Sequence, residues 1–152
     1  MYEPDLIVAS PSDGTTRLVV ETKLGGDLGA AADALKGYMI RARVPSGLLV
    51  ARDVVKVFRD SFRGYSPESI ETVQTVPTSE IPELQAYASH LKNDPVDFED
   101  TVYGWLDSLR YRAEHGFLRG SDSRFVNDVV PALVRGDIRV TGPRSVGHAA
   151  LG

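Results

Sequence analysis

The sequence contains no cysteine in its 152 residues, which excludes disulfide bonds, thiolate metal sites and a cysteine nucleophile. No apolar run approaches the length that a helix needs to cross a bilayer. Met1 is followed by Tyr-Glu-Pro-Asp, which lacks the basic and then apolar residues of a secretory leader. From these absences we expect a cytoplasmic protein without membrane association.

Two further absences narrow the chemistry. Neither Gly-x-Gly-x-x-Gly nor the Walker-type Gly-Lys-Ser/Thr occurs, which excludes an ATPase motor by its usual signature. The histidines at 90, 115 and 148 lie far apart and show no metal-ligand spacing. The sequence therefore makes no case for a zinc centre or for a Ser/His/Asp triad.

Length and composition indicate one globular domain, since 42% of the residues are hydrophobic. We assign residues 1–140 to this domain and the small, polar residues 141–152 to a flexible tail. The net charge of −4 argues against generic nucleic-acid binding. Residues 41–63 are nevertheless basic, and they form either a solvated face or a DNA-facing surface. The cations of this segment are Arg41, Arg43, Arg52, Lys56, Arg59 and Arg63.

The N-terminal region predicts a β-hairpin. Residues 6–8 are apolar, residues 18–20 are apolar and largely β-branched, and the turn formers of 10–16 separate them. Antiparallel pairing brings Asp5 to the end of the hairpin that carries Glu21 and Lys23. Because side chains alternate along a strand, Glu21 and Lys23 share one face and Thr22 points away from it.

Two neighbouring carboxylates and an ammonium group have a chemical use. Asp5 and Glu21 repel each other unless a cation lies between them, and their oxygens suit Mg²⁺ or Mn²⁺. The backbone carbonyl of Thr22 offers one more oxygen ligand. Lys23 is placed to orient a metal-bound water for attack on a phosphodiester. The alternative interpretation is a strand that ends in a solvated ion pair.

A helix and a second hairpin follow. Asp27 is the expected N-cap of a helix over 28–42, whose apolar residues recur at helical spacing. That helix forms a right-handed crossover to a strand at 48–51, parallel to the Glu21 strand, and a tight turn leads to an edge strand at 54–59. Arg52 lies at the tip of this hairpin, as a candidate nucleic-acid contact or as an ordinary turn residue.

Pro4-Asp5 followed by Glu21-Thr22-Lys23 at the end of an apolar strand resembles the PD-(D/E)xK nuclease superfamily, the restriction-endonuclease-like fold. Restriction-type members often carry Gln-x-x-x-Tyr on the crossover helix, where this chain has Ala34 and Tyr38. Over roughly the first sixty residues the sequence looks most like the nuclease domain of type I restriction enzyme motor subunits.

The resemblance implies an α/β fold with a mixed central sheet flanked by helices, whose core lies in residues 1–60. It also implies a Mg²⁺-dependent endonuclease that hydrolyses DNA, in which Asp5, Glu21 and Lys23 are catalytic and Asp5, Glu21 and Thr22 hold the metal. Lys36 and Tyr38 are nucleic-acid contacts by the same resemblance. DNA and partner restriction subunits are the expected partners.

Members of the superfamily usually have a helix and a first strand before the Pro-Asp, whereas here the motif begins at residue 4. Either these elements are missing, or a later segment or a second chain takes their place. An uncovered sheet edge would favour a homodimer. Residues 70–76 predict a further strand, and helices over 79–91, 95–109 and 124–135, the last interrupted at Pro131, form a helical cover.

Two other functions stay open. One is an inactive nuclease-like fold that binds DNA or assembles with proteins, favoured by the absent N-terminal elements, by Ala34 and by the acidic charge balance. The other is an unrelated α/β domain in which Glu21-Thr22-Lys23 has no role.

Overall fold

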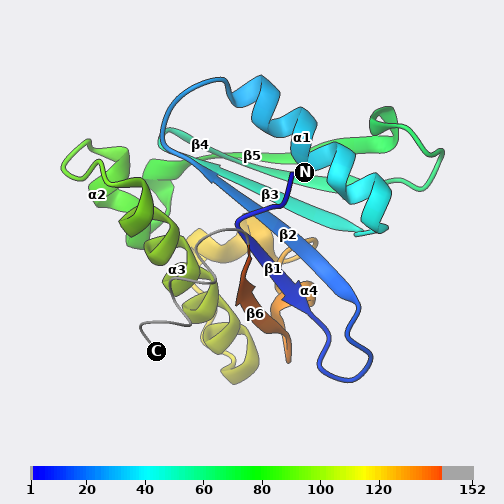
Figure 1. Ribbon diagram of the computed structural model, residues 1–152. Helices are drawn as coiled ribbons and strands as arrows, with labels where there is room; N and C mark the ends of the chain where they lie inside the picture. Colours follow the sequence, from blue (N-terminus) through cyan, green and yellow to red (C-terminus); the bar gives the residue numbers. More distant parts are fainter. Residues whose placement is uncertain (1, 142–152) are drawn as a thin grey trace.

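The structure, a computed structural model, describes residues 2–141. It is an α/β fold built on a six-stranded mixed sheet of order β5-β4-β3-β2-β1-β6, with helices on both faces (Figure 1). The strands are β1 (Leu6–Ala9), β2 (Thr16–Lys23), β3 (Ser46–Ala51), β4 (Val54–Asp60), β5 (Ile70–Pro77) and β6 (Asp137–Val140). The α-helices are α1 (Leu28–Ala42), α2 (Gln85–Ala88), α3 (Pro95–His115) and α4 (Val130–Leu133). Short 3₁₀ turns cover Pro67–Ser69, Thr78–Glu80, Pro82–Leu84 and Gly120–Phe125.

The predicted N-terminal hairpin and crossover are confirmed, but the prediction that the strand at 54–59 lies at an edge is wrong, because β5 pairs with β4 on its outer side. β1 and β2 pair antiparallel with Leu6 opposite Val20, which puts Asp5 beside the end of β2. Asp27 caps α1 because its carboxylate accepts a hydrogen bond from the Ala30 N–H at 3.0 Å. α1 then returns the chain to β3, which lies parallel to β2.

Alternation along β2 separates two cores. Val20 points into the larger core, which includes Trp105 of α3, whereas Val19 points into a smaller core under Leu35 of α1. Glu21 and Lys23 follow Val19 at a period of two, so they belong to the face of the sheet that α1 covers. Figure 1 shows α1 on one side of the sheet and α3 on the other.

The β1 edge is covered, and the prediction of an open sheet edge is wrong. β6 pairs antiparallel with β1 and places Val140 opposite Leu6. The Thr141 N–H extends this pairing by donating to the Asp5 carbonyl at 2.9 Å. A later segment thus occupies the edge, which removes the sequence-based reason for expecting a homodimer. Thr141 belongs to this ladder rather than to a tail, and residues 142–152 of the predicted tail lie outside the described residues.

The helical cover is only partly as predicted. α3 begins at Pro95, as its pattern indicates, and runs to His115. The segment predicted as a helix over 79–91 consists of 3₁₀ turns and the single turn α2. The helix expected over 124–135 is reduced to α4, because Pro131 is compatible only with the first turn of a helix. Within residues 2–141, every helix is too short or too polar to span a bilayer.

The turn into β6 tolerates no side chain at Gly136. A Cβ there would lie 2.6 Å from Val8 Cγ1 and 2.8 Å from the Ala132 carbonyl oxygen. We therefore predict that Gly136→Ala lowers the free energy of unfolding by about 1–3 kcal/mol. The matched control is Gly104→Ala in α3, where a Cβ meets nothing within 4 Å. That variant gains helix propensity and is expected to raise stability by about 0.5–1 kcal/mol. Denaturant unfolding of both variants checks the pair, and equal effects would contradict the close packing of β6.

Candidate metal centre

Asp5 directly precedes β1, and hydrogen bonds fix both its side chain and its backbone. Its Oδ2 accepts hydrogen bonds from the Thr22 N–H at 2.9 Å and from the Thr22 hydroxyl at 2.8 Å. Its backbone carbonyl accepts from the Thr141 N–H. The Thr22 side chain, for which no role was predicted, thus fixes the carboxylate of Asp5 against the end of β2. Within residues 2–141, the second oxygen, Oδ1, accepts no hydrogen bond.

Glu21 is the least satisfied acid of the site. Its Oε1 is buried and has no hydrogen-bond partner in the described part of the chain. Burial, followed by the negative charge of Asp5, raises the pKa of Glu21 to about 7. Two acids therefore lie close together, and one of them has an oxygen without a partner. This is the arrangement that a bound cation would stabilise.

Tyr2 is part of this site, although sequence reasoning did not find it. Its hydroxyl is buried beside the Glu21 carboxylate, and burial, the charge of Glu21 and hydrogen bonding to that carboxylate raise the pKa of Tyr2. Its ring packs edge-on against Tyr38 at a centroid distance of 6.2 Å. Tyr2 precedes the first strand, where no periodicity links it to Glu21, so the sequence carried no signal for it.

Lys23 lies at the end of β2, beside the acids. Within residues 2–141 no carboxylate oxygen lies within 4.0 Å of its ammonium, although its charge lowers the pKa of Glu21. The side chain passes over Gly26, since a Cβ there would be 3.8 Å from Lys23 Nζ. A cavity of about 190 Å³ adjoins it, formed by the loop after β2 and by the β3–β4 turn. Lys23 therefore has no ion pair to hold it away from a substrate.

Of the three predicted nucleic-acid contacts, Tyr38 and Arg52 border the site and Lys36 does not. Tyr38 of α1 packs against the ring of Tyr2. The Lys36 ammonium lies 5.2 Å from the centre of the Phe58 ring, on the opposite flank of α1 towards β4. Arg52 lines the same cavity as Lys23. Its guanidinium, however, donates to the carbonyls of Tyr87 and Lys92, each at 3.1 Å, and to Asn93 Oδ1. A nucleic-acid role for Lys36 and Arg52 stays a prediction, because both side chains have structural partners.

Two carboxylate oxygens of the site are candidate ligands for a Mg²⁺ ion. Within residues 2–141, Asp5 Oδ1 and Glu21 Oε1 have no hydrogen-bond partner. The N–H and C=O of one residue in a strand point to the same side, so the Thr22 carbonyl faces the edge where Asp5 lies. No group of three or more His, Asp or Glu residues within 2–141 is arranged for a metal. Mg²⁺ suits such a site, since it keeps several waters and needs only one or two carboxylates.

Comparison of the chain with protein-family models, with curated proteins and with solved structures found no match. The site is therefore interpreted from its own geometry and from the motif.

The pKa of Glu21 predicts how stability depends on pH. Between pH 4.5 and about 7 the folded state keeps a proton on Glu21 that the unfolded state releases, so stability falls as pH rises through this window. We expect Glu21→Gln to raise the free energy of unfolding by about 1–3 kcal/mol at pH 8 and to change it little at pH 4. Denaturant melts at both pH values give the comparison. A stabilisation that is the same at both pH values would show that the charge of Glu21 is not its cause.

Proposed function

We propose that this protein is a metal-dependent nuclease of the restriction-endonuclease-like type that hydrolyses phosphodiester bonds in DNA. The observation that carries the proposal is the buried, unpartnered Oε1 of Glu21 beside the Asp5 carboxylate. Perturbed acids of this kind are typical of functional sites.

Asp5, Glu21 and the backbone carbonyl of Thr22 would hold Mg²⁺ or Mn²⁺. The metal, when bound, supplies a Lewis acid and offsets the charge of the phosphodiester. Thr22 contributes in a second way, because its N–H and hydroxyl fix the orientation of Asp5. Tyr2 covers Glu21 and keeps water from that side of the carboxylate, which strengthens electrostatic interactions within the site.

Lys23 is assigned to the attacking water. Its ammonium has no ion pair in the described part of the chain, so its hydrogen atoms are available to a water and to a phosphate oxygen. In this role Lys23 Nζ orients the water for in-line attack and stabilises the negative charge that develops on the phosphate.

The topology supports the same proposal. A hairpin that brings an Asp beside Glu-x-Lys, a crossover helix and a parallel strand occur in the order that the motif implies. β6 and α3 cover the side of the sheet where the resemblance implies an N-terminal strand and helix. DNA is preferred to RNA as the substrate because the resemblance is to restriction proteins.

A second function, an inactive module that only binds nucleic acid, is favoured by one observation. Asp5 Oδ2 already accepts two hydrogen bonds from Thr22, which leaves that carboxylate a single oxygen for a metal. This module would bind its partner equally well with and without Mg²⁺.

The decisive experiment is cleavage of circular and linear DNA with Mg²⁺ or Mn²⁺. We expect the native chain to cut both forms, and we expect Asp5→Asn and Lys23→Ala each to lower the rate by at least about 100-fold. Cutting of the circular form identifies an endonuclease. Lys92→Ala is the matched control, because Lys92 is paired with Asp97 at 3.5 Å and lies outside the site.

Calorimetric titration with Mn²⁺ separates the two functions if no cleavage is seen. Metal binding that Asp5→Asn abolishes would keep the metal centre and exclude catalysis by this chain alone. Activity that survives Asp5→Asn and Lys23→Ala would overturn the proposed site.

A further inference from the structure

The loop over residues 61–66, between β4 and the 3₁₀ turn at 67–69, holds two aromatic rings in solvent. Phe62 is 64% exposed and Tyr65 is 80% exposed. The loop is pinned at its base, because Ser61 Oγ donates to the Ser69 carbonyl at 2.7 Å and the Phe62 N–H donates to Asp60 Oδ1 at 2.8 Å. Phe62 has a φ of 58°, which is unusual for a residue with a large side chain. This backbone conformation costs free energy, and the loop nevertheless exposes two apolar rings to water.

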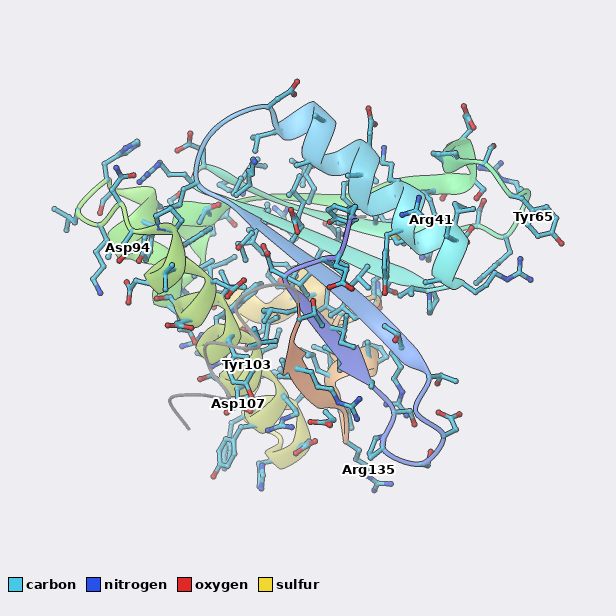
Figure 2. The ribbon with its side chains drawn as sticks, viewed as in Figure 1. Arg41, Tyr65, Asp94, Tyr103, Asp107 and Arg135 are labelled. Carbon is cyan, nitrogen blue, oxygen red and sulfur yellow. The ribbon has the colours of Figure 1, made fainter. Side chains whose placement is uncertain are left out.

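A cation without an acidic partner in residues 2–141 lies against this loop. The Arg43 guanidinium at the end of α1 lies 5.2 Å from the centre of the Tyr65 ring, and no carboxylate oxygen lies within 4.0 Å of it. The Arg41 guanidinium instead turns back along α1, since a Cβ at Gly37 would lie 3.2 Å from Arg41 Nη1. Arg63 is different, because it pairs with Glu71 at 2.6 Å. Figure 2 shows Arg41 on the last turns of α1 and Tyr65 at the outer end of the loop.

A small cavity opens between α1 and the loop. It has a volume of about 160 Å³, and its walls include Ile40, Arg43, Phe62 and Tyr65. Asp60 is the acid in its wall, but Asp60 is only 6% exposed and its Oδ1 accepts from the Phe62 N–H and from the Ser69 hydroxyl. The cavity is smaller than the roughly 300–1,000 Å³ of a usual cofactor pocket, so it suits a single planar ring.

We propose that this surface, made of Arg43, Phe62 and Tyr65, binds single-stranded nucleic acid. An unpaired base stacks on the free face of Tyr65, and a neighbouring phosphate lies against Arg43. The pairing of exposed rings with unpartnered arginines is the chemistry by which proteins bind single strands. In a duplex the bases are stacked on one another, so the two rings would have no partner there.

The surface lies on the α1 side of the sheet, as Glu21 and Lys23 do. The inference that the bound strand is also the substrate rests on the proposed function. It deepens that function by selecting DNA with an unpaired segment, such as a flap, an overhang or a bubble. Binding itself does not depend on the metal centre.

The test is fluorescence anisotropy of a labelled single-stranded oligonucleotide and of the matching duplex, in EDTA so that no cleavage occurs. We expect the single strand to bind at least 10-fold more tightly than the duplex. Tyr65→Leu should weaken single-strand binding about 10-fold, whereas Tyr65→Phe, which keeps the ring, should change it less than about 2-fold. Arg43→Ala should weaken binding and lower the salt slope by about 0.7, as expected for one lost phosphate contact.

Matched controls come from the opposite side of the molecule. Tyr111→Leu removes an exposed ring of α3, stacked on His115, and Arg124→Ala removes an exposed arginine, and neither should affect binding. Thermal melts of each variant show that the fold is intact. Equal effects of Tyr65→Leu and Tyr111→Leu, duplex binding as tight as single-strand binding, or binding insensitive to salt would each overturn the inference.

The nuclease proposal and the single-strand-binding proposal can be refuted independently. Tyr65-dependent binding in EDTA without any cleavage in Mg²⁺ would support this surface and count against the nuclease. Cleavage that requires Asp5 but is indifferent to Tyr65 and Arg43 on every DNA form would do the reverse.

Discussion

The candidate site depends on how Asp5 is held at the junction of three strands. Its carbonyl accepts from Thr141 beyond the end of β6, and its side chain accepts from the backbone and hydroxyl of Thr22 in β2. The carboxylate therefore occupies the place where the β1–β2 ladder would otherwise continue. Because backbone groups fix it, the approach of Asp5 to Glu21 follows from the register of the sheet rather than from flexible side chains.

The closeness of the Asp5 and Glu21 carboxylates is electrostatically unfavourable. Asp122, an acid with a structural role, has a very different environment. Asp122 is only 2% exposed, but Arg112 donates to both of its oxygens at 3.0 and 2.9 Å. Burial alone would raise the pKa of Asp122, and the hydrogen bonds from Arg112 and the Arg119 N–H reverse this and lower it. For Glu21, the hydrogen bonds from Tyr2 and from the Asp5 N–H do not offset burial and the charge of Asp5, and its pKa rises to about 7. An acid with an unsatisfied oxygen beside another acid is costly for stability, and the proposed cation would offset that cost.

Local patterns accounted for the elements that position the site, and nonlocal contacts accounted for the rest. The hairpin, the Asp27 cap, the strand at 70–77 and the start of α3 at Pro95 each had a signal within a few residues. β6 did not, since four residues with only Ile138 buried are recognisable only once β1 offers a partner. Tyr2 and the three acceptors of Arg52 are likewise defined by residues distant in the sequence. Lys36 and Tyr38 are two residues apart on a helix and face different sides, so the helical pattern alone separates these two predicted contacts.

The two flanks of α1 face the two proposed sites: one faces the candidate metal centre, and the other ends at the surface formed with Phe62 and Tyr65. One flank carries Tyr38 towards Tyr2, and the other carries Lys36 towards Phe58 and ends at Arg43 beside Tyr65. A helix of 15 residues is about 22 Å long, so the two sites lie within reach of one short stretch of extended nucleic acid. The net charge of −4 is compatible with such binding because, within residues 2–141, neither Lys36 nor Arg43 has a carboxylate oxygen within 4.0 Å. A phosphate backbone bound at this surface would interact with the local charge on the α1 side rather than with the net charge of the chain.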